Sequence, residues 1–424
     1  MPSDGADTRA WVLHPDIPNQ DKGRDPSRAL EEAVSLAHAL PGIEVCGGTV
    51  VRLTRPHPGM LFGKGKVAEL KAQVKAEELE LVLIDGPVTP VQQRNLEKAL
   101  GVKLLDRTGL ILEIFSDRAA TREGVLQVEM AALSYQRTRL VRAWTHLERQ
   151  RGGLGFVGGP GETQIEADRR AIDEQLVRLR RQLDKVVKTR SLHREARAKV
   201  PFPIVALVGY TNAGKSTLFN HLTGAEVMAK DMLFATLDPT MRKINLPGGG
   251  PEVILSDTVG FISDLPTELV AAFRATLEEV TAADLICHVR DISHPESEEQ
   301  ARDVTEILDS LGVAETTPQI EVWNKIDLLD DDARQVVGNR AARHADVQLL
   351  SAVTGEGMQA LSAAIVVALA GKTQEETLQL GFEAGRQRAW LFEKGLVEGE
   401  EQTEEGYTLT VRWNDKQKAQ FAGL

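Results

Sequence analysis

The segment "IVALVGYTNAGKSTLFNHLTG", residues 204–224, constrains the fold more than any other part of the 424-residue chain. It places Gly209, Gly214, Lys215 and Ser216 in the pattern G-x-x-x-x-G-K-S, between an apolar run and an amphipathic run. A strand that ends in a glycine-rich turn and leads directly into a helix gathers backbone N–H groups at the helix N-terminus. The pattern is typical of a phosphate-binding loop, and it predicts a doubly wound, mostly parallel sheet around the loop.

The residue types in this loop suit a nucleotide phosphate. Backbone N–H groups can surround a β-phosphate, Lys215 can reach the β- and γ-phosphates, and the Ser216 hydroxyl can ligate Mg²⁺. The alternative interpretation is a plain glycine turn with a surface lysine. Three further motifs follow in the order typical of a nucleotide-binding sheet, and they favour the phosphate loop.

The next motif, "ILSDTVG", ends a predicted strand with Asp257 and Gly260. The carboxylate can hold the Mg²⁺ shell through water, and the glycine N–H can contact a γ-phosphate. We therefore predict catalytic roles for Lys215 and Gly260. The following residue is Phe261, which cannot orient an attacking water as a glutamine does. We expect slow intrinsic hydrolysis, assisted by a partner or by another residue of the chain.

Two motifs at the ends of the last two predicted strands of this sheet indicate a guanine pocket. In "VWNKID", Asp327 can accept hydrogen bonds from guanine N1–H and the 2-amino group, while the stem of Lys325 covers the base. Adenine lacks both donors and would leave the carboxylate unpaired, which gives discrimination on the order of 10⁴-fold. In "LLSAVTG", the backbone N–H groups of Ser351 and Ala352 can reach guanine O6. The four motifs together predict GTP rather than ATP.

Two features of the site stay open from the sequence. A γ-phosphate switch needs a hydroxyl that joins the Mg²⁺ shell only with GTP, and "LFATLDPT" offers both Thr236 and Thr240. Ordinary loop threonines are the alternative for each. Asn212 in the phosphate loop can either brace the loop or bind a monovalent cation through its amide oxygen.

Strand and helix patterns divide the rest of the chain. After a polar leader, strands are predicted at 10–17, 42–53, 79–86 and 101–109, with helices at 66–79 and 89–100. Two long amphipathic helices, 122–150 and 163–200, form a predicted hairpin. Further strands are predicted at 204–210, 249–258, 284–293, 319–328 and 346–352, followed by a helix at 382–395, a β-hairpin at 396–413 and a short terminal helix.

The predicted fold class is therefore α/β. It comprises a phosphate-loop domain with a doubly wound, mostly parallel sheet, an N-terminal α/β domain extended by a long helical hairpin, and a small C-terminal α/β module. The predicted domain boundaries give residues 1–118 for the N-terminal domain, 119–200 for the hairpin, 201–371 for the phosphate-loop domain and 372–424 for the C-terminal module.

Charge is unevenly distributed along the chain. The net charge is −12, but residues 118–199 contain 18 Lys and Arg against 10 Asp and Glu. Such a basic arm can bind nucleic-acid phosphates, although a solvated helix with internal ion pairs is the alternative. Only Cys46 and Cys287 are present, which suits a reducing compartment. The polar start "MPSDGADTRA" and the lack of a long apolar run predict a cytoplasmic protein.

A second glycine pattern, "GLGFVG" at 153–158, matches the G-x-G-x-x-G spacing of dinucleotide-binding loops. It follows a predicted helix of about 30 residues, whereas that fingerprint requires a preceding strand. We therefore interpret it as the tip of the basic hairpin, where small residues let the backbone approach RNA closely.

These motifs together resemble the HflX family of ribosome-associated GTPases, in the Obg-HflX superfamily of the TRAFAC class. The resemblance rests on "LFGKGK" at 61–66, "GGPGETQIEADRR" at 158–170, "GYTNAGKST", "LFATLDPT", "DTVGFI" and "NKID". By motif, it implies that Thr236 and Ser216 contact Mg²⁺. The residues that it implies for contact with GTP are Gly209, Tyr210, Thr211, Asn212, Ala213, Gly214, Lys215, Ser216, Phe234, Ala235, Thr236, Leu237, Asp238, Asp257, Thr258, Val259, Gly260, Asn324, Lys325, Ile326, Asp327, Ser351, Ala352 and Val353.

The resemblance also implies a function. Family members are expected to bind the large ribosomal subunit, to hydrolyse GTP when ribosomes stimulate them, and to split stalled or stressed ribosomes into subunits. We expect a monomer that contacts rRNA through the basic hairpin and its glycine-rich tip, without a membrane partner. The alternatives are a GTP switch for large-subunit assembly or quality control that does not split ribosomes, and a protein-interaction regulator of a membrane protease.

Overall fold

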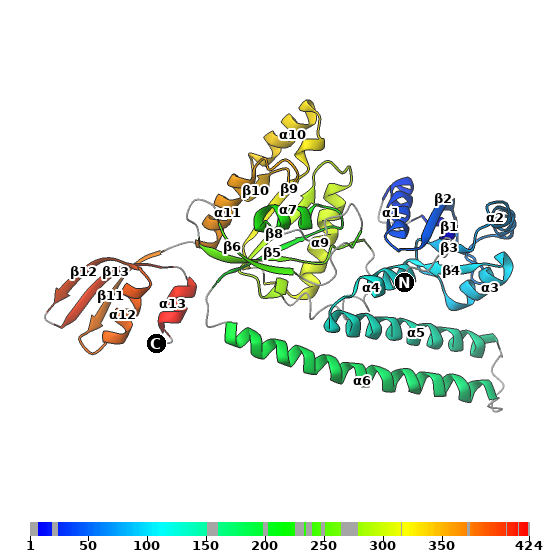
Figure 1. The fold of residues 1–424 in the computed structure, drawn as a ribbon, viewed down its shortest axis with the longest axis horizontal. Helices are drawn as coiled ribbons and strands as arrows, with labels where there is room; N and C mark the ends of the chain where they lie inside the picture. Colours follow the sequence, from blue (N-terminus) through cyan, green and yellow to red (C-terminus); the bar gives the residue numbers. More distant parts are fainter. Residues whose placement is uncertain are drawn as a thin grey trace.

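The computed structural model describes residues 7–18, 24–150, 160–197, 202–224, 233–234, 240–246, 251–263, 279–314, 316–370, 374–403, 405–413 and 415–422. The predicted fold class is confirmed: three α/β parts each contain their own sheet, and two long helices run beside the first. Figure 1 shows the central domain between the N-terminal domain and the C-terminal module. The predicted domain divisions after residues 118, 200 and 371 remain predictions.

The N-terminal domain is built on a four-stranded parallel sheet in the order β2-β1-β3-β4. Helices α1 and α4 contribute to the apolar core on one face, and α2 and α3 to the core on the other. The strands are β1 (Thr8–Asp16), β2 (Ile43–Arg52), β3 (Leu81–Ile84) and β4 (Lys103–Asp106). The helices are α1 (Pro26–His38), α2 (Lys64–Ala76), α3 (Pro90–Leu100) and α4 (Arg107–Arg118).

Helices α1 and α4 were not predicted. The first begins after Asp25, whose carboxylate accepts hydrogen bonds from the N–H groups of Ser27 and Arg28, so an N-cap and a proline start a helix between the predicted strands 10–17 and 42–53, where the sequence analysis gives no element. The second starts directly after β4, where Asp106 caps it by accepting from Gly109 N. A strand that passes into a helix without a loop leaves no turn signal.

The predicted helical hairpin is present as α5 (Arg122–Gln150) and α6 (Pro160–Arg197), which lie side by side (Figure 1). The Tyr135 hydroxyl donates to Asp106 at 2.6 Å and fixes α5 to the N-terminal sheet. The glycine-rich segment predicted to join the two helices, residues 151–159, lies outside the described residues.

The central domain contains a six-stranded sheet in the order β10-β9-β8-β5-β7-β6. All neighbouring pairs are parallel except β6 and β7, and β6 was not predicted. The strands are β5 (Ile204–Gly209), β6 (Thr240–Asn245), β7 (Glu252–Asp257), β8 (Leu285–Asp291), β9 (Gln319–Asn324) and β10 (Val347–Leu349). The helices are α7 (Lys215–Thr223), α9 (Ser297–Leu311), η1 (Ile326–Leu328), α10 (Asp331–Ala341) and α11 (Met358–Ala370).

The C-terminal module has an antiparallel sheet in the order β11-β13-β12. The predicted helix and hairpin are confirmed as α12 (Gly385–Glu393), β12 (Val397–Thr403) and β13 (Gly406–Trp413), and α13 (Asp415–Ala422) follows. The additional strand β11 (Gln374–Gly381) has a mostly polar sequence whose residues are exposed or half-buried, which explains why strand patterning missed it.

The N-terminal and central domains share one apolar core. Residues of α1 and α4 belong to the same buried cluster as residues of β5, β8 and α9. The Phe115 ring packs edge-on against Phe234, with centroids 4.7 Å apart, and Phe261 is buried in the same cluster. The two domains are therefore packed against each other through side chains next to the phosphate loop. Among the described residues, no helix is both long and apolar enough to cross a membrane.

Candidate nucleotide site

The phosphate loop, residues 209–216, connects β5 to α7 at the carboxyl edge of the central sheet. Lys215 is buried and donates to the carbonyl oxygens of Gly209 at 3.1 Å and Tyr210 at 2.7 Å. A lysine has three donors, so these bonds fix the ammonium on the loop and leave one donor for a ligand. Burial lowers the pKa of Lys215 to about 8, although Asp257 opposes the shift. A phosphate here would favour the charged form.

Ser216 and Asp257 meet where the metal site was predicted. The Ser216 hydroxyl donates to Asp257 at 2.7 Å, and Asp257 is buried at the end of β7. The neighbouring Thr258 is held in the sheet, since its hydroxyl donates to the Leu207 carbonyl at 2.6 Å. A hydroxyl and a carboxylate oxygen at one point form a hard-oxygen donor pair of the kind Mg²⁺ prefers.

Asn324 joins the phosphate loop to the two base-pocket motifs. Its amide nitrogen donates to the Ala213 carbonyl, and its amide oxygen accepts from Ala352 N, both at 2.9 Å. Gly214 has a φ of +94°, and a Cβ there would lie 2.2 Å from the Asn324 amide nitrogen, so both the conformation and the space require glycine. The structure therefore brings the three motifs together through a single side chain.

The remaining predicted base-pocket residues lie around this asparagine. Asp327 and Val353 are exposed, whereas Ile326, Ser351 and Ala352 are buried. The exposed carboxylate is accessible to a base edge, and the two motifs meet through a 3.4 Å bond from Ile326 N to the Leu350 carbonyl. The roles predicted for these residues remain predictions.

The segment that starts at the last residue of β7, residues 257–263, lies directly on the phosphate loop, and we call it the switch segment. Phe261 N donates to the Gly209 carbonyl at 3.1 Å, and Thr211 N donates to the Phe261 carbonyl at 2.7 Å. A Cβ on Gly260 would lie 3.1 Å from the Lys215 Nζ atom. The two predicted catalytic residues are thus neighbours, and Phe261 is buried in the apolar core.

The described residues include only some of those left open by the sequence, namely the switch threonine and Asn212. Thr240 begins β6 and is paired in register with Asp257. Ala235, Thr236, Leu237 and Asp238 lie outside the described residues, and Phe234 packs on Phe115 in the shared core. Asn212 is exposed, with a left-handed φ of 59°.

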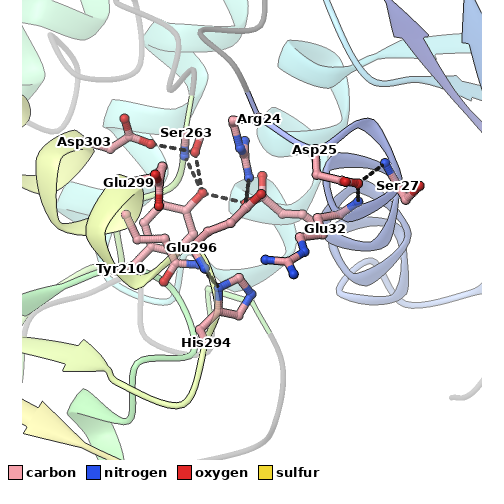
Figure 2. Close-up of polar contacts among 12 residues, drawn as sticks. Arg24, Asp25, Ser27, Glu32, Tyr210, Ser263, His294, Glu296, Glu299 and Asp303 are labelled. Carbon is pink, nitrogen blue, oxygen red and sulfur yellow. Dashed lines mark hydrogen bonds and ion pairs between the residues drawn. The ribbon is translucent and has the colours of Figure 1, made fainter. Parts of the chain in front are cut away.

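A buried polar network joins the switch segment to the N-terminal domain (Figure 2). The Tyr210 hydroxyl of the phosphate loop donates to Glu32 of α1 at 2.6 Å and accepts from Ser263 N at 2.8 Å. Arg107 of α4 donates to the Ser263 carbonyl at 2.9 Å and to Glu32 at 2.7 Å. Arg24 donates to Glu32 at 3.0 Å. The sequence did not point to these contacts.

The charges in this network compensate each other. Burial raises the pKa of the Glu32 carboxyl, but Arg107 and Arg24 outweigh it and hold that pKa below its usual value. Burial and the Glu32 carboxylate raise the pKa of the Tyr210 phenol. Glu32 is therefore ionised and Tyr210 neutral at physiological pH, so the phenol can act as the donor in their bond.

The basic hairpin divides into a structural part and an exposed part. Arg139, one of the basic residues of the arm 118–199, is mostly buried and donates to Asp106 at 3.0 Å and to Tyr135, so it fixes α5 to the N-terminal domain. Exposed basic residues recur at intervals of three and four along α6, which places them on one helix face. They are Arg178, Arg181, Lys185 and Lys188.

The fold and the site together define a P-loop GTPase: a doubly wound sheet, a phosphate loop at its carboxyl edge, and an N-K-x-D motif held beside that loop. The central domain matches a family model described as "50S ribosome-binding GTPase" over residues 204–325. Models for the GTP-binding GTPase N-terminal and middle regions match residues 27–116 and 118–197, and the HflX C-terminal domain model matches residues 336–422. The chain belongs to the HflX family of GTPases.

Curated relatives agree with this assignment. The chain is 53% identical over 334 residues to GTPase HflX of Magnetococcus marinus, covering 79% of this chain and 76% of that protein. It is 44% identical over 394 residues to GTPase HflX of Escherichia coli, covering 93% and 91%. It is also similar to the crystal structure of a GTP-binding protein from Sulfolobus solfataricus in complex with GDP, with 23% identity, a TM-score of 0.46, and 85% and 99% of the two chains covered.

Proposed function

We propose that this GTPase binds the large ribosomal subunit through its helical hairpin and uses GTP to split stalled or stressed ribosomes into subunits. The observation that carries the proposal is the exposed basic face of α6, formed by Arg178, Arg181, Lys185 and Lys188. Phosphate contacts made by such a face give RNA affinity without base specificity. The ribosome-binding description of the matching family model supports the same partner. We expect the protein to act as a monomer.

Within the nucleotide site, we propose that GTP is held by the residues named in the sequence analysis. The phosphate-loop N–H groups and Lys215 bind the phosphates, Asp327 accepts from the guanine edge, and Lys325 lies along the base face. Mg²⁺, which supplies positive charge to the phosphate oxygens when bound, is proposed to be ligated by Ser216 and Thr236. Asp257 is proposed to act through water beside Ser216, so that Ser216 and Asp257 belong to one metal site. Their 2.7 Å contact supports a shared site.

Communication between GTP and the hairpin is proposed to run through the switch segment. Gly260 N–H is expected to contact the γ-phosphate, whereas in this structure Phe261 is bonded to the phosphate loop and Ser263 to Tyr210 and Arg107. We propose that the two arrangements of the segment compete, because Arg107 of the N-terminal domain binds the Ser263 carbonyl and Tyr210 links Ser263 N to Glu32. GTP binding would thereby change the docking of the domain that carries the hairpin.

Subunit dissociation measured by light scattering with purified ribosomes tests the function. We expect dissociation with GTP, and no dissociation with either GTP or a non-hydrolysable analogue would overturn the splitting function and leave the two alternatives named in the sequence analysis. The double variant Arg178→Glu and Arg181→Glu should weaken ribosome binding and reduce the log–log salt slope by about 2 if both residues contact phosphates. A matched control is the same reversal at Arg302 and Arg343, which are exposed but lie outside the hairpin. Equal effects of the two double variants would remove α6 from the interface.

A further inference from the structure

Asp291 is the last residue of β8 and contacts the lysine of the N-K-x-D motif. Its Oδ2 atom lies 2.8 Å from the Lys325 Nζ atom, and the two side chains are only 14% and 21% exposed. The contact is built on backbone pairing, because Asp291 is in register with Asn324 and Ile292 N donates to the Asn324 carbonyl at 3.1 Å. The ends of β8 and β9 therefore place these side chains together.

The backbone conformation of Lys325 is unusual, and its side chain needs a fixed contact to stay in one place. Its φ of 66° and ψ of 33° lie in the left-handed region, which is unfavourable for a residue with a Cβ atom. Asn324, the residue before it, is fixed through Ala213 and Ala352. A lysine stem nevertheless has four rotatable methylene groups, so the far end needs a contact of its own to stay in one place.

Asp291 is itself held in position. Its Oδ1 atom accepts from the Ser293 hydroxyl at 2.6 Å and from Ser293 N at 3.1 Å. One carboxylate oxygen is thus bound within the turn after β8, while the other faces the lysine. Such an ordered, mostly buried acceptor differs from a surface ion pair, in which both side chains must be ordered at the moment of contact.

We propose that Asp291 is a positioning residue for nucleotide binding, which holds the Lys325 stem against the face of the base. The proposal rests on the proposed placement of Lys325 in the base pocket. A stem that covers the base face contacts any purine, whereas Asp327 reads the base edge. Asp291 therefore contributes to affinity for guanine and hypoxanthine nucleotides equally, and Asp327 contributes to the choice between bases.

The test is a double-mutant cycle read out by GDP and IDP affinities. Asp291→Asn keeps the shape of the side chain but removes its charge, and both affinities should fall about fivefold with their ratio unchanged. Lys325→Met should weaken both nucleotides. Asp291→Asn added to Lys325→Met should cause no further loss, since the partner is already absent. Ser293→Ala, which removes one bond to Asp291 and none to Lys325, is the matched control and should change affinity less than twofold.

The possible failures are distinguishable. If Lys325→Met leaves both affinities unchanged, the proposed base pocket is wrong and the positioning role falls with it. If Lys325→Met weakens binding but the two losses add in the double variant, Asp291 acts only on the fold and the positioning role is overturned. A changed GDP to IDP ratio in Asp291→Asn would also overturn it.

Discussion

Removing the Tyr210 hydroxyl should loosen the phosphate loop from the N-terminal domain and the switch segment from the phosphate loop. Tyr210→Phe keeps the buried ring but deletes the donor to Glu32 at 2.6 Å and the acceptor of Ser263 N at 2.8 Å. The hydroxyl also lies 2.6 Å from the Ser263 Oγ atom. No other group of the phosphate loop is altered by this change, so the variant perturbs the contact between domains while leaving the loop backbone intact.

The magnitude follows from the charge and burial of the partners. A hydrogen bond to a charged group is worth about 1.5–3 kcal/mol, and a buried N–H left without its acceptor costs about 1–3 kcal/mol. Arg107 still binds both Glu32 and the Ser263 carbonyl, which limits the loss. We expect a net weakening of the docked arrangement by about 2 kcal/mol, which is roughly a 30-fold shift in its population.

The assay is GTP turnover without ribosomes, combined with hydrogen exchange. If the docked arrangement competes with the contact between Gly260 N–H and the γ-phosphate, Tyr210→Phe should raise basal turnover by up to about 30-fold. Amide exchange of the switch segment should become faster in the same variant.

Tyr135→Phe is the matched control. Its hydroxyl is also mostly buried and donates to Asp106 at 2.6 Å, but it connects α5 with the N-terminal sheet rather than two domains at the nucleotide site. It should lower stability without raising turnover. Unchanged or slower turnover in Tyr210→Phe, with normal GTP affinity, would refute competition between docking and catalysis.

Three further predictions concern single groups of the central domain. Because the pKa of Lys215 is about 8 and a bound phosphate raises it, GDP binding at pH 8 should take up about half a proton and weaken above that pH. Calorimetry in two buffers of different ionisation enthalpy measures the uptake, and zero uptake would contradict the burial argument. Burial lowers the pKa of His288 from 6.5 to about 4, so the unfolded chain binds the proton first and stability should fall by up to about 3 kcal/mol between pH 6.5 and 4. His288→Gln should flatten that acid limb in denaturant titrations, and an unchanged limb would assign it to other groups. Asp327→Asn should shift preference from guanine toward xanthine nucleotides, whereas unchanged GTP affinity would show that the base edge binds elsewhere.

The convergence of the motifs at the candidate nucleotide site could be predicted from the sequence because the motifs are local and their order is fixed. Each motif follows a strand directly, and parallel strands bring their carboxyl ends to one edge. Ser216 and Asp257, 41 positions apart, therefore lie within 2.7 Å as the motif order implied. The sequence could not show that Asn324 is the side chain that joins three motifs, since that depends on the separation of loops in space.

The contact between domains could not be predicted in the same way. Glu32 and Tyr210 are 178 positions apart and belong to separate sheets, so no spacing or period relates them. Glu32 also lies in α1, a helix that the sequence patterns did not predict. A signal was present at Arg107, a charged residue placed directly after the buried strand end "KLLD", where a doubly wound sheet binds its ligands.

The position of Arg107 directly after β4 explains why the N-terminal sheet contacts the switch segment. Its strand order β2-β1-β3-β4 changes direction between β1 and β3, and the crevice beyond such strand ends is where open α/β sheets bind ligands. His14 near the end of β1 bonds to Asp85 after β3 at 2.8 Å, and Asp85 accepts from Arg107 at 2.6 Å. Arg107 in turn donates to the Ser263 carbonyl. The strand ends of the N-terminal sheet thus contact a segment of the other domain through Arg107, and a change at Asp85 should reach the candidate nucleotide site through Arg107 and Ser263.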